Sequence, residues 1–267
     1  MTERSTDHFV LMYHHVAPLT QLGGLAPFIV SPAAFTSQLD AIEGQGLEVV
    51  ALHDILENGA GPNGNGGPRV VITFDDCPKA LLDFAVPELE RRGWKATFFA
   101  VAGKVGGYND WDVSAGLPQL PLMSWEDIRT LSALGHEVGA HGFSHVSLRR
   151  CRRSEARLEL LRARETLEQG VGKSVRSLAY PYGDVPDGYR ELCGEAGYAS
   201  SCSIFSMSSR AALDRFDIRR ILVSERDTGL RMRMKLSRIY LRLRGLAVDR
   251  TVLRKNGTQP RLAAPAR

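Results

Sequence analysis

The sequence lacks several features that would point to a membrane or secreted protein. It has no apolar run of about eighteen residues, which is the length that a transmembrane helix requires. Residues 1–8 do not show the basic and then apolar pattern of a secretion signal. The cysteines are few and scattered, without metal-ligand spacing or a disulfide framework: Cys77, Cys151, Cys193 and Cys202. We therefore expect a reduced, cytoplasmic setting.

The sequence also lacks an even distribution of charge. Residues 229–267 contain eleven Lys or Arg and one acid, a balance of +10, whereas the whole chain carries +4. The first 228 residues therefore carry −6 and form a mildly acidic body. The basic tail shows neither a nucleic-acid-binding motif nor interleaved aromatic residues, so no nucleic-acid partner is expected.

Strands and helices alternate along the first 228 residues. The sequence predicts strands at 9–14, 47–52, 69–74, 96–101, 137–140, 177–180, 198–202 and 218–223. Helices are expected at 32–43, 81–92, 154–169 and 189–195, and another begins after Ser124, where Asp127 completes a variant of the capping box. The alternation indicates an α/β fold with a parallel sheet that closes like a barrel.

Two adjacent acids follow the apolar run that starts at Val70. Unpaired carboxylates are costly at the end of a buried strand, so Asp75 and Asp76 need a reason to be there. The simplest alternative is a pair that caps the next helix. Because adjacent side chains on a strand point to opposite faces, the two acids are expected to have different roles.

A second polar cluster runs from His141 to His145. If the backbone is helical there, the i, i+4 spacing aims both imidazoles at one point. Together with Asp76 they form a three-ligand site with open coordination positions, and Asp75 is left as a general base. A hydrogen-bonded surface pair is the alternative for the histidines, and an iron oxygenase is the alternative chemistry for the ligand set.

The polar residues fall where predicted strands end. In a parallel barrel these ends and the loops after them carry the chemistry. His14, Asp75, His141 and the turn at 180–183 all obey this rule. A backbone N–H in that turn can stabilise an oxyanion. The irregular segment 103–121, which carries Trp111, is expected to form a lid or a wall of the cleft.

These motifs resemble those of the polysaccharide deacetylases, also called NodB-homology domains or carbohydrate esterase family 4. Thr73–Asp76 is similar to their TFDD motif, His141–His145 to their HxxxH motif, and Ala179–Gly183 to their third motif. Leu11–His14 resembles the histidine motif that some exopolysaccharide deacetylases carry at the start of the chain. The resemblance spans about residues 9–223 and implies a distorted, incomplete (β/α) barrel.

The resemblance also implies roles for the site residues. Asp75 would be the base, and Asp76, His141 and His145 would hold a divalent metal, with Zn²⁺ expected first and Co²⁺, Ni²⁺ or Mn²⁺ as alternatives. His14 would be the general acid, and the Tyr182 N–H would help to form the oxyanion hole. Contacts to the substrate are expected from Tyr180, Pro181 and Trp111.

Two positions depart from the family pattern. Cys77 stands where a glycine usually follows the two aspartates, and Ala179 replaces the arginine that orients the base. From its place near the last strand, we expect Arg220 to substitute for that arginine.

Three segments are expected along the chain: a catalytic domain at 1–228, a basic helical extension at 229–258 and a disordered tail at 259–267. In the extension an apolar stripe runs beside basic residues at helical spacing: Met232, Leu236, Ile239, Leu243 and Leu246 beside Arg231, Lys235, Arg238 and Arg242. The alternatives are a helix that packs on the barrel and one that contacts an anionic membrane, here the inner membrane face.

The sequence thus predicts a metal-dependent hydrolase that removes N-acetyl groups from a polysaccharide or its lipid-linked precursor. A glycan-binding homologue with impaired catalysis is the main alternative, because of Cys77 and Ala179. The sugar, its linkage and the oligomeric state do not follow from the sequence.

Overall fold

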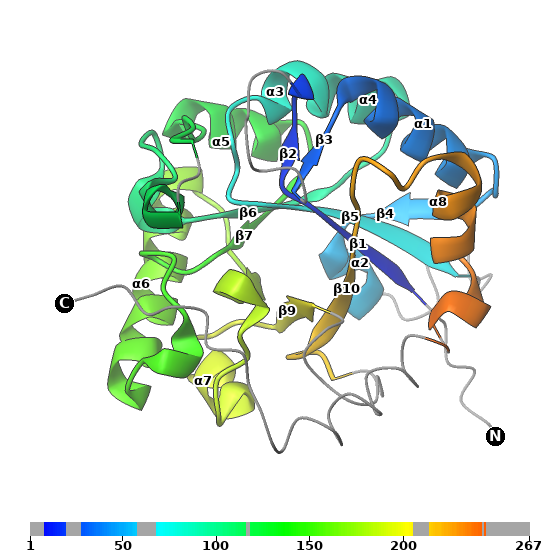
Figure 1. The fold of residues 1–267 in the computed structure, drawn as a ribbon. Helices are drawn as coiled ribbons and strands as arrows, with labels where there is room; N and C mark the ends of the chain where they lie inside the picture. The colour runs from blue at the N-terminus through cyan, green and yellow to red at the C-terminus, as the bar shows by residue number, and fades with distance from the viewer. Residues whose placement is uncertain are drawn as a thin grey trace, which may run out of the picture.

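The structure is a computed structural model that describes residues 8–19, 28–57, 68–115, 118–204, 214–241 and 243. Seven of the strands in these ranges are parallel and form a closed barrel (Figure 1). Around the barrel they follow the order β1 (Phe9–Tyr13), β10 (Ile218–Leu222), β9 (Ser200–Ile204), β8 (Ser177–Ala179), β7 (Glu137–Ala140), β6 (Thr97–Ala100) and β5 (Arg69–Asp75). The pairing of β1 with β5 closes the ring, which confirms the predicted barrel.

The barrel is distorted where two strands share one edge of β5. Strand β4 (Glu48–Val50) pairs with Arg69–Val71, and β6 pairs with Thr73–Asp75 farther along the same strand. Two short strands, β2 (His15–Val16) and β3 (Ile29–Val30), pair outside the barrel. The predicted strands are all present, with boundaries shifted by up to about two residues, as is usual at strand ends.

Helices surround the barrel, and the local sequence explains where two of them begin. The Ser31 hydroxyl accepts from the Ala34 N–H at the start of α1 (Pro32–Glu43). Ser124 and Asp127 form the predicted capping box of α5 (Trp125–Ala133). The other α-helices of the described ranges are α2 (Leu52–Glu57), α3 (Leu81–Phe84), α4 (Val86–Arg91), α6 (Arg153–Val171), α7 (Tyr189–Glu195) and α8 (Gly229–Lys235).

One predicted helix is divided in two. The segment 81–92 forms α3 and α4, separated at Ala85, because Pro87 has no N–H to continue the hydrogen-bond ladder. Four short 3₁₀ turns follow strands β6, β7 and β8: η2 (Ala102–Lys104), η3 (Asp110–Ala115), η4 (Leu148–Arg150) and η5 (Pro181–Gly183).

The strands bury both of their faces, as expected for parallel strands covered by helices. Inside the barrel a small cluster packs together: Val10, Val50, Leu52, Val71, Phe99, Ala179 and Cys202. The alternate residues face the helices and belong to the larger core, which contains Leu11, Ile72 and Phe98. Asp75 lies two and four residues after Thr73 and Val71, so its side chain points into the barrel.

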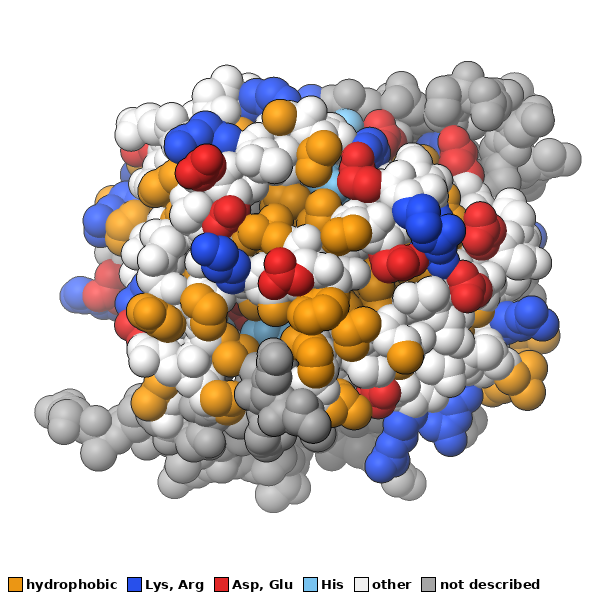
Figure 2. Space-filling view, turned by 90° about the horizontal axis from the view of Figure 1, so that it is seen from above, with side chains coloured by type: hydrophobic (Ala, Val, Ile, Leu, Met, Phe, Trp, Pro, Cys, Tyr) orange, Lys and Arg blue, Asp and Glu red, His pale blue; other side chains and the backbone are white. Residues whose placement is uncertain are grey.

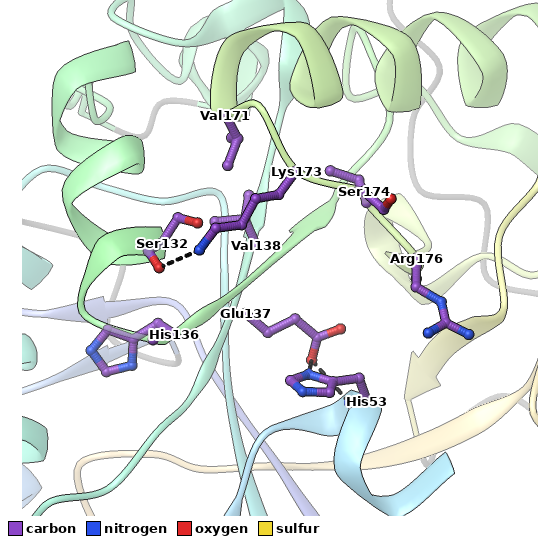
Figure 3. A pocket seen from close by; sticks show the side chains of 11 residues that line it. His53, Ser132, His136, Glu137, Val138, Val171, Lys173, Ser174 and Arg176 are labelled. Atoms are coloured by element: carbon purple, nitrogen blue, oxygen red, sulfur yellow. Dashed lines mark hydrogen bonds and ion pairs between the residues drawn. The ribbon is translucent and has the colours of Figure 1, made fainter. Parts of the chain in front are cut away.

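A pocket of about 260 Å³ lies at the amino-terminal ends of β7 and β8 (Figure 3). Within it Glu137 and His53 point toward each other, and Lys173 donates to the Ser132 carbonyl oxygen over 2.9 Å. The Glu137 carboxylate also accepts from Ser177. None of the predicted site residues lines this pocket, because they lie at the opposite ends of the strands.

The C-terminal extension begins as a helix that packs on the protein. Met232 and Leu236 are buried, and α8 lies beside α1 (Figure 1). The predicted apolar stripe is interrupted, because α8 ends at Lys235 and helical residues resume at 238–241. Leu246, Arg242 and the predicted tail at 259–267 lie outside the described residues. No described helix is long and apolar enough to cross a membrane.

The tight interior of the barrel makes Gly139 on β7 sensitive to substitution. A Cβ there would lie 2.5 Å from a Phe99 ring carbon. We expect Gly139→Ala to lower the free energy of unfolding by about 1–3 kcal/mol, as overpacked cores do. Urea denaturation followed by circular dichroism measures this change.

Gly194→Ala is the matched control, because no atom lies within 4 Å of a Cβ at that position in α7. It should leave stability unchanged or raise it by up to about 1 kcal/mol, the helix propensity of Ala over Gly. Equal urea midpoints for Gly139→Ala and the wild type would contradict the packing described for the barrel.

Candidate active site and metal centre

The predicted polar residues meet at the carboxyl ends of the strands. Asp75 is the last residue of β5, His14 follows β1, and His141 follows β7. The His14 Nε2 and His141 Nε2 atoms each lie 3.9 Å from Asp75 Oδ2. The barrel thus brings together residues from three strands that are far apart in the sequence.

Asp76, His141 and His145 form a compact ligand set. Their ligand atoms all lie within 4.8 Å of one another, and all three residues are buried. Asp76 Oδ1 lies 3.6 Å from His141 Nε2 and 3.4 Å from His145 Nε2. No other cluster of this kind occurs in the part of the chain that the structure describes.

The chemistry of these donors fits a divalent cation. His141 Nδ1 lies 2.8 Å from the Ala179 carbonyl oxygen, which can only accept, so this nitrogen carries the hydrogen and Nε2 keeps its lone pair. Burial lowers the pKa of both His141 and His145, which favours the neutral imidazole that binds metals. One carboxylate and two neutral imidazoles suit Zn²⁺ and other first-row metals.

Left-handed backbone shapes this site. Among the described residues, positive φ outside glycine occurs at Asp76, Cys77, His145 and Tyr182, with φ between 54° and 67°. Such conformations are uncommon for residues with a Cβ, and they concentrate at functional sites. The left-handed turn at Asp76 directs the Asp76 carboxylate toward His141. The adjacent Asp75 faces the same histidine.

The HxxxH segment is not helical, so the two imidazoles meet without the helical i, i+4 geometry that was one way to bring them together. Residues 141–145 form a loop in which Gly142 and His145 both have positive φ. The Glu159 carboxylate on α6 accepts from the Phe143 N–H, the Ser144 N–H and the Ser144 hydroxyl over 2.8–3.1 Å. Glu159 therefore holds the loop that presents the histidines, a role that local spacing could not reveal.

Arg220 pairs with Asp75, as predicted. Its two terminal nitrogens donate to the two carboxylate oxygens over 2.5 and 2.7 Å. Burial alone would raise the pKa of Asp75, but the charges of Arg220 and His141 and the hydrogen bonds from the guanidinium hold it well below its usual range. Arg220 also contacts the Thr73 hydroxyl and the Ser203 carbonyl oxygen, so residues of two other strands, β5 and β9, hold it.

His14 faces Asp75 and packs against Phe28, whose ring centroid is 4.8 Å away. Burial lowers the pKa of His14 to about 4, with Arg220 and His141 acting in the same direction and Asp75 opposing them. The ring is therefore neutral at pH 7, and it can donate a proton only after accepting one. No local pattern predicted the contact between His14 and Phe28.

The aromatic residues divide into two groups. Trp111 stacks on the His145 ring at 4.2 Å, and the half-exposed Tyr182 meets the same ring edge-on at 4.7 Å. The Tyr180 side chain instead points into the core, where its hydroxyl donates to the Phe216 carbonyl oxygen. Pro181 is buried beside Gly142. Trp111 and Tyr182 are thus at the site, whereas the predicted contacts of Tyr180 and Pro181 with substrate find no support.

Cys77 is not part of the ligand set. It is buried and packs in the core between the barrel and the helices. Its backbone N–H donates to the Asp75 carbonyl oxygen, and its own carbonyl accepts from Met123. Cys77 therefore stabilises the turn after β5 through its backbone and is not a metal ligand.

Comparison with known proteins agrees with this geometry. The profile of the family described as polysaccharide deacetylase matches residues 63–201, which is half of the chain. The chain belongs to the polysaccharide deacetylase family. The match includes Asp75, Asp76, His141, His145 and Tyr182, whereas His14 and Arg220 lie outside it and join the site only in the folded structure.

Two curated deacetylases are similar in sequence. A chitooligosaccharide deacetylase of Sinorhizobium fredii is 31% identical over 140 residues, which are 52% of this chain and 58% of that protein. A poly-β-1,6-N-acetyl-D-glucosamine N-deacetylase of Staphylococcus aureus is 24% identical over 244 residues, 83% of this chain and 80% of that protein. The chain thus spans only a little over half of the first relative.

Solved structures of deacetylases share the fold. IcaB from Ammonifex degensii superposes with a TM-score of 0.70 at 25% identity, over 86% of this chain and 96% of that one. The Streptococcus pyogenes deacetylase PplD superposes with a TM-score of 0.71 at 19% identity, over 86% and 97% of the two chains. The barrel described above is therefore the barrel of the polysaccharide deacetylases.

The pair formed by Arg220 and Asp75 predicts a large, pH-dependent effect on stability. Arg220→Met leaves a buried carboxylate without its partner, which should lower the free energy of unfolding by about 3–5 kcal/mol at pH 7. In the wild type the folded-state pKa of Asp75 is depressed, so its contribution is complete above the unfolded pKa of about 4 and is lost only as the pH falls below that value. In the Arg220→Met variant the unpaired Asp75 carboxyl takes up a proton as the pH falls from 7. The difference in the free energy of unfolding between the variant and the wild type should therefore become smaller.

Urea denaturation at pH 7 and pH 5 measures both effects. Arg190→Met is the control, because Arg190 is 62% exposed in its ion pair with Asp214 and should contribute less than about 1 kcal/mol. A stability loss for Arg220→Met no larger than that of the control would contradict the buried pair.

Proposed function

We propose that this protein is a metal-dependent hydrolase that removes N-acetyl groups from the amino sugars of an exopolysaccharide or its lipid-linked precursor. The observation that carries the proposal is the meeting of a buried ligand set, Asp76, His141 and His145, with a carboxylate that Arg220 keeps ionised. An ionised carboxylate beside a cation site can accept a proton from a water molecule that attacks an amide.

Asp76, His141 and His145 would hold the cation, with Zn²⁺ as the first candidate and Co²⁺, Ni²⁺ and Mn²⁺ as alternatives. When bound, a divalent cation lowers the pKa of a water molecule and polarises the amide carbonyl. Two contacts hold the histidines in advance: the Ala179 carbonyl oxygen holds the His141 ring, and the Glu159 carboxylate holds the loop that carries His145.

The remaining groups move protons and orient the amide. Asp75 accepts a proton from the attacking water as the water oxygen bonds to the carbonyl carbon of the amide. The backbone N–H of Tyr182 orients the carbonyl oxygen as negative charge develops on it. His14, 3.9 Å from Asp75, receives this proton from Asp75 and delivers it to the nitrogen as the C–N bond breaks. The carboxyl product then gives its remaining proton to the amine, so the products are acetate and an ammonium group.

The surroundings of the site suit a sugar. Several of the exposed large hydrophobic side chains lie in the loops that follow the strands: Leu19, Phe28, Tyr108, Val113, Val146 and Tyr182. Figure 2 shows hydrophobic side chains gathered around a hollow in which a histidine is visible. An exposed apolar patch of this kind marks a ligand-binding groove, and a sugar ring offers C–H faces that pack on such side chains.

Two other functions compete with this proposal. A glycan-binding protein without activity would bind the same sugars and release no acetate, whereas an iron oxygenase would need O₂. The buried pair of Asp75 and Arg220 favours hydrolysis, since neither alternative has a use for an ionised base beside the ligand set.

The test is acetate release from purified protein. Poly-β-1,6-linked N-acetylglucosamine and chitin oligomers are the first substrates, since relatives are named for them, followed by lipid-linked N-acetyl sugars. Chelation should abolish the release and added Zn²⁺, Co²⁺, Ni²⁺ or Mn²⁺ should restore it, equally well without O₂. Asp76→Ala protein should bind no metal, and its rate of acetate release should fall by more than about 100-fold. Mutation of residues that only hold the metal ligands in place already lowers activity by up to about that factor.

Asp83→Ala is the matched control, because Asp83 is an exposed acid on α3. It should keep both metal and activity. Asp76→Ala protein with full metal content and activity would refute the proposed site, and substrate binding without acetate release by the wild type would favour the glycan-binding alternative.

We further propose that the C-terminal extension contacts an anionic membrane surface. Four large apolar side chains on it are strongly exposed, at 56–73%: Leu230, Met234, Ile239 and Leu243. Arg231 and Arg233 are exposed beside them. Apolar side chains among basic residues suit binding to acidic lipid headgroups, and such a contact would place the enzyme near a lipid-linked substrate. The cytoplasmic setting stays a prediction.

Co-sedimentation of the full chain with vesicles tests this contact. Vesicles with phosphatidylglycerol should bind at least about tenfold more protein than neutral vesicles, and high salt should weaken the binding because it screens surface charge. Ile239→Asp should reduce binding, whereas Leu158→Asp, at a similarly exposed leucine on α6, should not. Equal binding by the wild type and Ile239→Asp would refute the contact.

A further inference from the structure

The segment that follows β10 returns to the end of that strand. Lys235 on α8 donates from Nζ to the Leu222 carbonyl oxygen over 2.7 Å and to Asp227 Oδ2 over 2.7 Å. The same Asp227 oxygen accepts from the Ser224 N–H and hydroxyl over 2.8 and 2.7 Å. We call Ser224, Asp227 and Lys235 the C-terminal clasp.

The C-terminal clasp is largely buried, and its Lys235 lies on α8, a helix that packs on the core. The Asp227 and Lys235 side chains are only 10% and 17% exposed, so solvent screens their attraction less than that of a surface pair. Met232 in α8 and Leu236, the residue that caps the end of this helix, are buried in the core. Lys235 therefore contacts the end of β10 from a helix that is held by its buried side chains.

The clasp holds the place where β10 and β1 end together. Leu222 pairs with Met12 in the sheet, and the Val223 N–H donates to the Met12 carbonyl oxygen over 3.0 Å. From α1, the Gln38 amide donates to the Ser224 carbonyl oxygen over 3.0 Å. The carbonyl that Lys235 binds is thus part of the junction between the two strands.

Both strands carry site residues close to this junction. Arg220 lies two residues before Leu222, and His14 lies two residues after Met12. Arg220 reaches Asp75 over 2.5 and 2.7 Å, and His14 lies 3.9 Å from the same carboxylate. A displacement of about 1 Å at a catalytic constellation can cost about 100-fold in rate, so the position of this junction matters for turnover.

We propose that Lys235 is a positioning residue for the deacetylation reaction. Through the Leu222 carbonyl and Asp227 it holds the ends of β1 and β10 so that Arg220 and His14 both face Asp75. The inference rests on the proposed function, and it gives the C-terminal extension a role in turnover that is separate from membrane contact.

The test compares steady-state kinetics of the full chain loaded with metal, on the substrate that the wild type deacetylates. Lys235→Met keeps the length of the side chain and removes the charge and the donors. We expect kcat to fall by about tenfold or more, because a displacement smaller than 1 Å should cost part of the roughly 100-fold loss that 1 Å can cause. KM should stay within about twofold of the wild-type value, and the metal content should be unchanged. Lys235→Arg, which can donate to both oxygens, should recover kcat to within about threefold of the wild type.

Met232→Ala separates positioning from stability. It removes buried packing from the same helix without touching the clasp, so Tm should fall at least as much as in Lys235→Met, as for other buried apolar truncations. At a temperature well below both Tm values, its kcat should stay within about twofold of the wild type. The inference is overturned if kcat of Lys235→Met stays within twofold of the wild type, or if Met232→Ala loses kcat to the same degree.

A second variant covers the case in which Lys235→Met does not fold. Asp227→Asn keeps the shape of the clasp and weakens its charge pair, so it should lower kcat in the same direction by a smaller factor, and unchanged kcat would overturn the inference. Wild-type protein that releases no acetate refutes the proposed function and this inference with it. Active wild type with an equally active Lys235→Met protein refutes the inference alone.

Discussion

The carboxylate of Asp75 lies inside the barrel, where an unpaired charge would cost several kilocalories per mole. Arg220 makes that position tenable by donating to both oxygens, and it is itself held by Thr73 and by the Ser203 carbonyl. The pair joins β5 to β10 across the interior. The ionised state of the Asp75 carboxylate, which His14 approaches to 3.9 Å, depends on this contact.

A second constraint is the conformation of the chain where the strands end. Parallel strands would leave adjacent side chains on opposite faces, but left-handed residues at Asp76, His145 and Tyr182 redirect the chain toward one point. Such conformations need support from their surroundings. The loop of His145 is tied to Glu159, and the turn at Asp76 is closed by the Cys77 N–H on the Asp75 carbonyl.

The departures from the family pattern now have separate explanations. Ala179 lacks the arginine side chain of the family pattern, but its carbonyl fixes the tautomer of His141, and Arg220 binds Asp75, the proposed base, from another strand. Cys77 adopts the left-handed conformation that a glycine would adopt more easily. The described site therefore keeps its ligand set and an arginine beside Asp75 in spite of both departures.

Three features could be predicted from the order of residues: the alternation of strands and helices, the acids and histidines at strand ends, and the capping residues of α1 and α5. They depend on local periodicity and on chemistry at fixed spacing. Which groups meet became clear from the folded chain. The contact between Asp75 and Arg220 joins residues 145 positions apart, the HxxxH segment proved to be a loop held by Glu159, and the Tyr180 side chain turned into the core. Such outcomes depend on the closure of the barrel and on backbone angles after each strand, which residue types constrain only weakly.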